Sequence, residues 1–450
     1  MKKRQVIIII GGNAAGAAAA AKAKRTEPLA DVWLLEKSEF ISTGTCELPY
    51  VISGEITDYQ KLVFFTPEKF QDEKKVNVRV AHSVDFVDRK KKTIEVTDVY
   101  SGKTHQVSYD KLIFATGSQV NPLNGLTGEY DNLFKLKSVA DLKLISDYFS
   151  SNVIKDAVIL GAGYVGLELA ESLLSRGIKV RLIEKAPYPF PTAEPEIRGI
   201  LSKVIEKGGI DFIPNVQKYS FRMAENKISA IVEGSRVLES DVFFNCTGFV
   251  PNVSAAQASG LKIGAAGGIS VNYYLQTSDP DIFAAGDCSE SVEFITGNKM
   301  ISNLATIAHE QGHLAGNNAV SINKNITAKI ILNTSVRLFG SYLAQCGLSE
   351  EDAEKNGFKV NTVTEILPNL VPIMPDSGNT FIKLNYDKSS KRVLGASIWG
   401  GKEVSGYADI IQLFIRLKIP ATELSGNYYN YTPTLSPFRN ILSAIGRKIK

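Results

Sequence analysis

The stretch Val6-Ile-Ile-Ile-Ile10, followed by Gly11-Gly12-Asn13-Ala14-Ala15-Gly16, decides the fold of this chain. The apolar run has the length and the β-branched composition of a buried strand. The glycine-rich turn opens an alanine-rich segment that predicts a helix reaching about Arg25. A second apolar run, Val32–Leu35, ends in Glu36. The order of strand, glycine turn, helix, strand and acid predicts a βαβ unit that binds a dinucleotide.

The chemistry of this unit follows from its helix. Free N–H groups and the helix dipole favour an anion at a helix N-terminus, where a dinucleotide pyrophosphate would lie. Glu36 follows at the distance where an acid binds ribose hydroxyls. Asn13 stands in place of the middle glycine of the G-x-G-x-x-G motif. An ordinary βαβ turn without a nucleotide remains the alternative.

The same pattern occurs a second time. Ala157–Leu160 predicts a strand, and Gly161-Ala-Gly163-Tyr164-Val165-Gly166 is a complete fingerprint at the start of a helix that contains Glu168. Val180–Ile183 then ends in Glu184. Two such units with both acids in place are far more specific than one. They indicate one bound flavin and one exchanging nicotinamide nucleotide.

The acid of the second unit bears on the choice of nicotinamide cofactor. Glu184 should repel a 2′-phosphate and so favour NADH. Lys185 lies beside it and leaves NADPH open, although a solvated surface charge is the other interpretation. The cofactor is therefore expected to be NADH or NADPH.

Three further segments extend the two units. Lys111–Ser118 and Asp241–Gly248 are each a short apolar run that ends in a glycine turn. Asp281–Cys288 ends similarly, with Gly286 before Asp287. An aspartate just past a strand and a glycine can reach the ribityl hydroxyls of a flavin, so we expect Asp287 to do so.

The character of the sequence changes from about residue 330. Strand-like runs at Thr380–Tyr386 and Val393–Trp399 are joined by turn residues, and Gly406–Leu417 predicts a helix. This part indicates a separate α+β domain. The fold class is therefore α/β, with two Rossmann-like dinucleotide-binding domains and a C-terminal α+β domain.

Composition excludes several classes of protein. The chain has 450 residues, 44% of them hydrophobic and 22% charged, as in ordinary globular proteins. A net charge of +4 is too small to indicate nucleic acid or a membrane surface as partner. The basic, apolar start resembles a secretory signal, but its apolar run is only strand length. We therefore expect a cytoplasmic protein. The four cysteines, at positions 46, 246, 288 and 346, match neither a disulfide framework nor a metal site.

Together these motifs resemble the flavin-dependent pyridine nucleotide–disulfide oxidoreductases over essentially the whole chain, and most of all the coenzyme A-disulfide reductases and single-cysteine NADH oxidases and peroxidases. The motifs that carry the resemblance are Gly11–Gly16, Ser42-x-x-x-Cys46-x-x-Pro49-Tyr50, Ile52-Ser-Gly-Glu-Ile56, Ala115-Thr116-Gly117, Gly161–Glu168, Gly286-Asp287 and the tail Tyr431–Arg439. The resemblance implies a split FAD domain at 1–150 and 271–328, an NAD(P)H domain at 151–270 and a dimerisation domain at 329–450. It also implies a homodimer.

The resemblance completes the set of expected cofactor residues. His309 matches a position near the flavin, although a packed helix histidine is the other interpretation. The expected cofactor contacts are Gly11, Gly12, Asn13, Ala14, Ala15, Gly16, Glu36, Lys37, Ser42, Thr116, Gly117, Gly161, Gly163, Tyr164, Val165, Gly166, Glu184, Gly248, Gly286, Asp287 and His309.

Cys46 is the expected catalytic residue. Positions 41, 43, 49 and 51 are Ile, Thr, Pro and Val, so neither Cys-x4-Cys nor Cys-x-x-Cys is possible around it. Its sulfur is therefore either inert or reacts with an external partner. The resemblance implies a mixed disulfide with coenzyme A, which NAD(P)H reduces by way of the flavin. A lowered pKa is expected at this thiol, from flavin contact and any helix N-terminus.

Other acceptors stay open. A sulfenate cycle with peroxide or oxygen is one alternative. Its relatives typically carry a histidine in the first glycine loop, where this chain has Ala14. A coenzyme A-dependent persulfide or polysulfide reductase is a second alternative. Two further alternatives are a flavin reductase that needs no thiol and a flavoprotein that has no catalytic activity.

Coenzyme A carries a 3′-phosphate and a diphosphate, so its site needs cations. The residues that match family positions at this site are Lys22, Arg25, Ser42, Thr45, Lys74, Tyr431 and Arg439, the last two supplied by the partner subunit. Surface charge is the alternative for each cation. Thr45 replaces a common asparagine and Glu47 a usual glycine, and the segment Pro368–Pro375 lacks a tyrosine found in many coenzyme A-disulfide reductases.

Overall fold

The computed structural model describes residues 4–450, and its first body is built on the predicted βαβ unit. A five-stranded parallel sheet has the order β20-β9-β1-β2-β5. Its strands are β1 (Val6–Ile10), β2 (Asp31–Leu35), β5 (Asn77–Arg79), β9 (Lys111–Phe114) and β20 (Ile282–Ala284). β20 comes from a distant part of the chain, so the first body is made from two segments of sequence.

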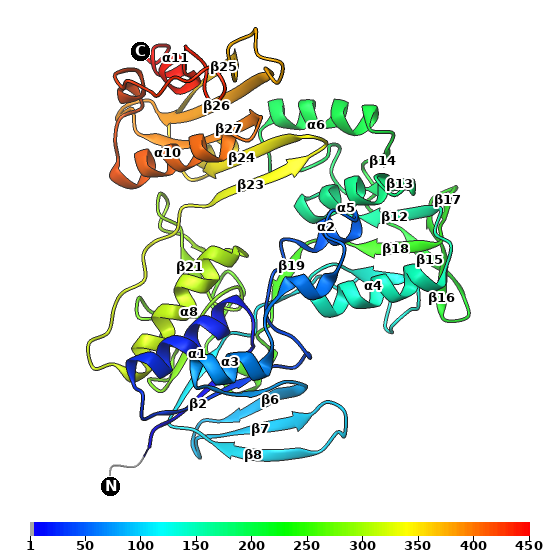
Figure 1. Ribbon diagram of the computed structural model, residues 1–450, viewed down its shortest axis with the longest axis vertical. Coiled ribbons are helices and arrows are strands. Elements are labelled where there is room, and N and C mark those ends of the chain that lie inside the picture. Colours follow the sequence, from blue (N-terminus) through cyan, green and yellow to red (C-terminus); the bar gives the residue numbers. More distant parts are fainter. Residues whose placement is uncertain (1–3) are drawn as a thin grey trace.

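Two helices cover one face of this sheet and touch each other closely. They are α1 (Ala14–Thr26) and α8 (Ala305–Val320), which lie side by side in Figure 1. A Cβ at Gly312 would lie 2.0 Å from the Ala15 carbonyl oxygen, and one at Gly316 would lie 2.2 Å from that of Ala19. Glycine on α8 therefore permits backbone contact with α1, which places the exposed side chains of the two helices together.

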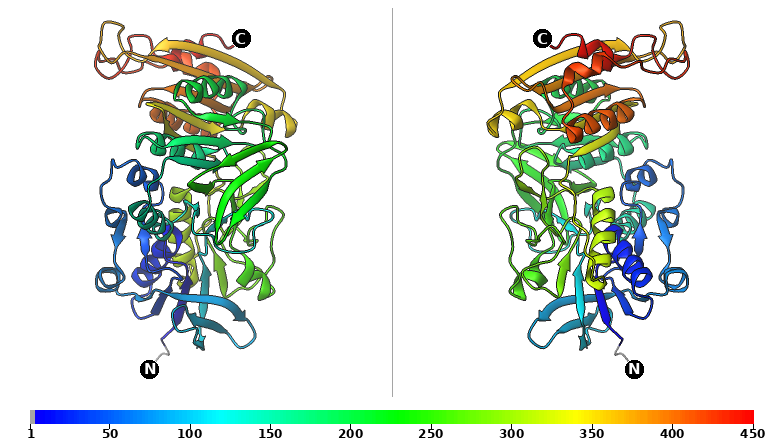
Figure 2. Two further views of the ribbon diagram at one scale, coloured as in Figure 1. Left: turned by 90° about the vertical axis from the view of Figure 1, so that its right-hand side faces the viewer. Right: turned by 90° about the vertical axis from the view of Figure 1, so that its left-hand side faces the viewer.

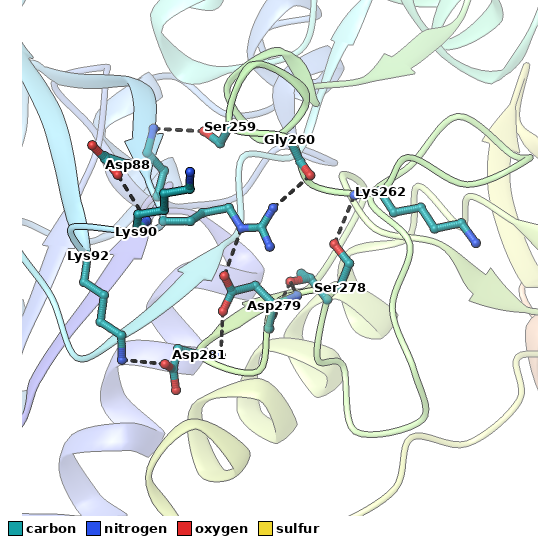
Figure 3. Close-up of polar contacts among 12 residues, drawn as sticks. Asp88, Lys90, Lys92, Ser259, Gly260, Lys262, Ser278, Asp279 and Asp281 are labelled. Carbon is teal, nitrogen blue, oxygen red and sulfur yellow. Dashed lines mark hydrogen bonds and ion pairs between the residues drawn. The ribbon is translucent and has the colours of Figure 1, made fainter.

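A three-stranded antiparallel sheet flanks the first body. It consists of β6 (His82–Asp88), β7 (Thr93–Asp98) and β8 (Thr104–Ser108). Figure 3 shows the polar contacts that fasten its β6–β7 turn to residues 259–281. Arg89 binds Asp279 at 2.9 Å, while Lys92 and Lys111 both bind Asp281 at 2.5 Å. These contacts hold the two segments of the first body together.

The second body repeats the first. Its parallel sheet has the order β11-β18-β12-β13-β14, and a three-stranded antiparallel sheet, β15-β16-β17, flanks it. The strands are β11 (Leu133–Lys135), β12 (Asp156–Leu160), β13 (Lys179–Ile183), β14 (Asp211–Ile213), β15 (Ser220–Ala224), β16 (Lys227–Glu233), β17 (Arg236–Glu239) and β18 (Val242–Asn245). Its helices are α4 (Val139–Ser151), α5 (Tyr164–Leu174) and α6 (Pro195–Lys207).

The borders of this body differ from the expected 151 and 270. β11 and α4 precede residue 151, yet β11 pairs in parallel with β18 and belongs to the second sheet. At the other border, β10 (Ser118–Val120) pairs with β19 (Phe249–Pro251), and α7 (Ser254–Ala258) already packs against β6 of the first body. The chain therefore crosses between the bodies on this strand pair, where sequence composition shows no break.

The third body is an antiparallel sheet with the order β23-β24-β27-β26-β25. Its strands are β23 (Asn333–Leu338), β24 (Ser341–Gly347), β25 (Val360–Pro368), β26 (Asn379–Asp387) and β27 (Val393–Gly400), and its helices are α9 (Glu350–Lys355), α10 (Val404–Leu417) and α11 (Ile441–Gly446). The predicted α+β character is confirmed. The two views of Figure 2 place this body at one end of the molecule and the N-terminus at the other. Within residues 4–450, no helix is both long and apolar enough to cross a membrane.

A buried ion cluster joins the second and third bodies. Lys383 on β26 lies within 3.1 Å of Glu194 and Glu196, and 2.7 Å from Glu350. The side chains of Lys383 and Glu194 are only 3% and 2% exposed. Glu194 also accepts hydrogen bonds from the Asn385 amide and the Glu350 N–H. The single cation therefore holds carboxylates from both bodies.

Replacement of Lys383 by methionine should destabilise the protein strongly. It would leave the Glu194 carboxylate buried without its cation, which typically costs about 3–5 kcal/mol. Thermal unfolding followed by calorimetry should show a clearly lower midpoint. The matched control is Lys355→Met, which breaks the exposed Lys355–Glu351 pair and should leave the midpoint unchanged. Equal midpoints for the two variants would contradict the role of the cluster.

Candidate active site

The first glycine turn is shaped by one close backbone contact. Gly11 has φ +103°, and a Cβ there would lie 2.2 Å from the Ala115 carbonyl oxygen. A Cβ at Gly16 would lie 1.7 Å from the Gly11 carbonyl oxygen. No side chain caps the N-terminus of α1, so its first N–H groups are left for another partner. The turn therefore has the form that an anionic pyrophosphate requires.

The second turn repeats this geometry. Gly161 has φ +100°, and a Cβ there would lie 2.4 Å from the Cys246 carbonyl oxygen. A Cβ at Gly166 would meet the Gly161 carbonyl oxygen at 1.9 Å, whereas the space beside Gly163 is open. α5 likewise begins without a side-chain cap. Val165 packs against the apolar core of the second body.

The two predicted ribose-binding acids are held in the same way. Glu36 accepts hydrogen bonds from the N–H of Gly12 at 2.6 Å and from that of Ser38 at 2.8 Å. Glu184 accepts from the N–H of Ala162 at 2.8 Å and from that of Ala186 at 3.0 Å. Each carboxylate therefore lies beside its glycine turn, where the sequence places it. Lys37 is exposed next to Glu36.

Asn13 connects the first turn to the Cys46 segment. Its side-chain oxygen accepts the N–H of Thr43 at 2.9 Å, and the Gly12 carbonyl accepts the N–H of Ser42 at 2.9 Å. These bonds fix β3 (Ile41–Thr43), which pairs with β4 (Val63–Phe65). A glycine at position 13 would lack this side chain. Asn13, the departure from the usual motif, thus positions the segment that leads to Cys46. Sequence reasoning missed this role of Asn13.

Asp287 lies in a polar cluster at the end of β20. Its carboxylate accepts the Ser118 hydroxyl at 2.9 Å and the Lys137 ammonium at 3.2 Å. The preceding Gly286 has φ +79°. Lys137 is a further site residue that sequence reasoning missed, because a lysine in a loop before α4 carries no motif. It also lies 4.4 Å from the ring centroid of Phe249.

The segments that follow β9 and β19 contact each other. The Thr116 hydroxyl donates to the Asn252 carbonyl at 2.7 Å, and the Asn252 amide donates back to the Thr116 carbonyl at 2.8 Å. Gly117 and Gly248 both have positive φ, at +66° and +98°. These glycines therefore allow the sharp turns where the two bodies meet.

Cys46 differs from the other three cysteines. It is exposed, whereas Cys288 and Cys346 are buried and Cys246 is partly buried. Burial raises the pKa of Cys246 and of Cys346 to about 12. Those two thiols are therefore inert at neutral pH.

The protein surroundings of Cys46 oppose a thiolate. Partial desolvation raises the pKa of its thiol, and the carboxylates of Glu47 and Glu168 raise it further, while Lys137 lowers it. The lowering expected from the sequence was assigned to flavin contact and a helix N-terminus, and the protein residues alone act in the opposite direction. The reason is that carboxylates outnumber cations around the sulfur, and the helix that follows, α2 (Leu48–Ile52), is very short. Any lowering therefore needs a charge or dipole that these residues do not supply.

Glu168 is a second site residue whose importance sequence reasoning missed, although it lies in the fingerprint helix. α2 packs against α5, and a small pocket between them is lined in part by Tyr50, Glu168, Glu171 and Arg337. Burial and the charge of Glu171 raise the pKa of Glu168 to about 7, and Arg337 opposes this rise. Glu168 therefore titrates in the neutral range.

Tyr164 points toward the third body. Its hydroxyl lies 2.6 Å from the Thr334 hydroxyl and 3.0 Å from the Gln345 side-chain oxygen, and its ring packs edge-on against Phe190. Burial raises the pKa of its phenol to about 12. In this arrangement the hydroxyl of Tyr164 is occupied by contacts within the protein.

The cations expected to bind phosphates are only partly brought together. Arg25 on α1 lies 2.9 Å from a ring nitrogen of His313 on α8, and Lys22 and Arg25 both lower the pKa of that histidine. His309 is exposed, one turn before His313, with Glu310 beside it at 3.5 Å. Lys74 is the last residue of α3 (Pro67–Lys74). Its ammonium instead lies over the ring of Phe65, 4.8 Å from the ring centroid. His313 is an addition that only the contact between α1 and α8 reveals.

The aromatic tail does not reach Cys46 within one chain. Tyr431 packs edge-on against Phe438, and both are exposed on the third body. Arg439 is exposed beside them. Figure 1 shows this part of the chain near the C-terminus, away from α1 and α2. The expected role of Tyr431 and Arg439 therefore requires a second subunit. Thr45, by contrast, is partly buried next to Cys46.

Family models match nearly the whole chain. The model described as pyridine nucleotide-disulphide oxidoreductase matches residues 5–312, and the dimerisation domain of the same family matches residues 333–440. The first match covers both glycine turns and Cys46, and the second covers the third body.

Curated relatives span the chain with similar identity. An NADH oxidase from Methanocaldococcus jannaschii is 30% identical over 92% of this chain and 91% of its own. A CoA-dependent NAD(P)H sulfur oxidoreductase from Pyrococcus furiosus is 30% identical over 96% of each chain. A coenzyme A disulfide reductase from Staphylococcus aureus is 26% identical over 95% of each. The relatives differ in their electron acceptors, so identity alone does not choose among these.

Cys46 should be the one thiol that reacts quickly in the native protein. Brief treatment with iodoacetamide, followed by mass spectrometry of peptides, should find the label on Cys46 and almost none on the buried Cys288. Cys46→Ser should abolish the rapid phase, because the remaining thiols are shielded. Rapid labelling at any other cysteine would contradict the assignment of Cys46 as the accessible nucleophile.

Proposed function

The chain belongs to the pyridine nucleotide-disulphide oxidoreductase family, and from this premise we propose that it reduces coenzyme A disulfide to two coenzyme A thiols with NAD(P)H. The observation that carries the proposal is the exposed Cys46, which has no cysteine partner nearby in sequence. Such a thiol can form a disulfide with a sulfur from outside the chain. The family depends on FAD and NAD(P)H.

The residues present fit both cofactors. Three features suit FAD: the close backbone contact at Gly11, the uncapped N-terminus of α1, and Glu36 held by the Gly12 N–H. Asp287 would bind the ribityl chain. The equivalent turn at Gly161 and Glu184 suits the nicotinamide nucleotide. When bound, the flavin supplies two-electron transfer from the nicotinamide to a disulfide. Glu184 favours NADH over NADPH by repelling a 2′-phosphate.

Cys46 carries the sulfur chemistry. Its thiolate attacks one sulfur of coenzyme A disulfide, so that one coenzyme A leaves as a thiolate and the other stays on Cys46 in a mixed disulfide. Two electrons and one proton then cleave the mixed disulfide into coenzyme A thiol and the Cys46 thiolate. The coenzyme A thiolate released in the first step takes up a second proton. In total, one coenzyme A disulfide, one NAD(P)H and one proton give two coenzyme A thiols and NAD(P)⁺.

Cations on α1 would receive the phosphates of coenzyme A. Lys22 and Arg25, in the C-terminal half of α1, are close to His313 on α8, and together they form a basic surface on these two helices. Ser42 and Thr45 line the approach to Cys46, and Lys74 is more remote because it lies over Phe65. The P. furiosus relative is named as CoA-dependent, which supports a coenzyme A site in this chain.

The second subunit would complete this site. The match to the dimerisation domain supports a homodimer, and the exposed Tyr431 and Arg439 are free to reach a partner. The four free cysteines suit a reducing compartment such as the cytoplasm.

A persulfide or polysulfide is the second candidate acceptor. The sulfur oxidoreductase relative favours it, and the same Cys46 would attack the same kind of S–S bond. An oxygen or peroxide acceptor is supported by the NADH oxidase relative. Ala14, at the start of α1, speaks against it, because the histidine base expected for that chemistry is missing.

Replacement of Cys46 by serine should abolish coenzyme A disulfide reduction while NADH still reduces the flavin. The serine cannot form a mixed disulfide, but the nucleotide sites are untouched. Anaerobic titration of the flavin band with NADH and a stopped-flow assay of disulfide reduction check the two parts. Mass spectrometry of the oxidised wild type should find a coenzyme A adduct on Cys46. If the Cys46→Ser variant still reduced coenzyme A disulfide, the proposal would be wrong. If the wild type turned over faster with polysulfide, peroxide or oxygen than with coenzyme A disulfide, that compound would replace it as the proposed acceptor.

Arg439→Met should raise the KM for coenzyme A disulfide by about tenfold or more, as expected for loss of a charged contact to a phosphate. The kcat should change little. Steady-state kinetics with coenzyme A disulfide and with hydroxyethyl disulfide check this, because the small disulfide has no phosphate to lose. Arg447→Met, another exposed arginine of the same region, is the matched control. An unchanged KM would remove Arg439 from the site.

A further inference from the structure

The helix that follows Cys46 is held by the other two bodies. α2 comes from the chain segment of the first body, yet it packs against α5 of the second body (Figure 1). Its buried side chains Leu48 and Ile52 lie in one apolar cluster with Val336 and Leu338 of β23. A helix of five residues is not stable alone, because so few residues cannot offset the cost of helix nucleation. The position of α2 is therefore determined by the second and third bodies.

The strand before Cys46 is held by the first body instead. Asn13 of the first glycine turn accepts the Thr43 N–H at 2.9 Å. On the other side of the thiol, the Tyr50 N–H donates to the Glu47 carbonyl at 3.1 Å, in the first turn of α2. Cys46 therefore lies on the short stretch that joins a strand fixed on one body to a helix fixed on the other two. Any contact that holds α2 also holds the sulfur relative to the first glycine turn.

Arg337 on β23 is the charged contact between the third body and this helix. Its guanidinium binds the Glu55 carboxylate through two nitrogens, one of them at 2.9 Å, and lies 4.9 Å from the ring centroid of Tyr50. Glu55 belongs to the motif Ile52–Ile56, to which the sequence alone assigned no role. The Ile56 N–H donates to the Tyr50 carbonyl at 2.9 Å, so both contacts act on one compact segment.

Two further hydrogen bonds brace the same corner. The Phe339 N–H, just after β23, donates to Glu171 on α5 at 2.8 Å. Arg176, just after α5, donates to the Ile52 carbonyl at the end of α2 at 3.3 Å. β23, α5 and α2 are thus joined in pairs by polar contacts. A guanidinium suits this corner because its planar fork binds a carboxylate through two nitrogens and also stacks on a ring, which an ammonium cannot do.

We propose that Arg337 is a positioning residue for Cys46: by holding Tyr50 and Glu55 it fixes α2, and with it the sulfur, relative to the first glycine turn. The inference rests on Cys46 being the reactive thiol of the proposed function, and it adds a residue of the third body to that site within one subunit. Arg337 acts through α2 and transfers neither electrons nor protons. Its effect on rate follows from geometry, because a reacting group misplaced by about 1 Å can cost about a hundredfold.

Hydrogen–deuterium exchange of the purified full-length protein with its bound flavin, read by mass spectrometry, tests the contact itself. Arg337→Gln should speed amide exchange in peptides that cover residues 47–56 by about fivefold, because local opening of α2 no longer breaks a stacked, two-nitrogen contact. Glu55→Gln removes the same contact from the other side and should speed exchange in the same peptides. The double variant should add little to either single variant, because the two changes remove one interaction.

Two more arginine variants separate position from charge. Arg416→Gln is the matched control, since Arg416 on α10 also lies over a ring, 5.5 Å from the centroid of Phe294, but has its hydrogen bond to the Lys329 carbonyl. It should leave exchange at residues 47–56 unchanged. Arg337→Lys keeps the positive charge but cannot bind Glu55 through two nitrogens. It should therefore resemble Arg337→Gln.

Stopped-flow and steady-state kinetics connect the contact to the thiol. In Arg337→Gln and Arg337→Lys, kcat for coenzyme A disulfide should fall about threefold or more with little change in KM, because the sulfur is misplaced while substrate binding is kept. Reduction of the flavin by NADH should keep its wild-type rate, since both glycine turns are untouched. Glu55→Gln stands in if Arg337→Gln does not fold, because Glu55 is half exposed.

Wild-type exchange at residues 47–56 in Arg337→Gln and Glu55→Gln would overturn the proposal. So would a wild-type kcat in Arg337→Lys, since charge alone would then suffice, and so would equal acceleration of exchange by Arg416→Gln. The exchange experiment uses no electron acceptor. If the wild type failed to reduce coenzyme A disulfide, the proposed substrate would be wrong, the exchange result would stand, and kcat would be compared with the acceptor that the wild type does reduce.

Discussion

The structure depends on how closely the backbone approaches itself at the two glycine turns. At Gly11 and at Gly161 the missing Cβ would lie 2.2 Å and 2.4 Å from a carbonyl oxygen at the end of the neighbouring strand. Only a glycine with positive φ permits this contact. The contact brings each helix N-terminus over the ends of the strands, next to the acid that follows the second strand. Both nucleotide sites are built on this one steric constraint.

The first turn also determines where the reactive thiol lies. Asn13 reaches from the turn to the N–H of Thr43, so the segment before Cys46 is fastened to the nucleotide site itself. The thiol then lies among carboxylates. Glu47, which stands at the N-cap of α2, is one of those that oppose its ionisation. The residues around Cys46 thus raise the pKa of its thiol, and a lower pKa has to come from bound groups.

The third body contributes side chains to ion pairs, hydrogen bonds and a pocket that it shares with the second body. Lys383 holds carboxylates of both in a buried cluster, Tyr164 of the fingerprint binds Thr334, and Arg337 enters the pocket between α2 and α5. These contacts come from two strands of one sheet, β23 and β26. A domain that the family uses for dimerisation therefore also contributes charge to the site within its own chain.

The sequence by itself determined both βαβ units, their acids, the α+β character of the last domain and the isolation of Cys46 from any local cysteine. These follow from short-range rules: strand length, helix periodicity, the need for glycine in a turn and the spacing of motifs. It misplaced the domain borders, because β11 joins a sheet whose other strands come later in the chain. Only the tertiary structure decided the charges around Cys46. Lys137, Glu168 and Asp287 are far apart in sequence, and the pKa of a thiol depends on desolvation and on charges that folding brings close. For this reason the sequence did not predict that the surrounding residues raise the pKa of Cys46.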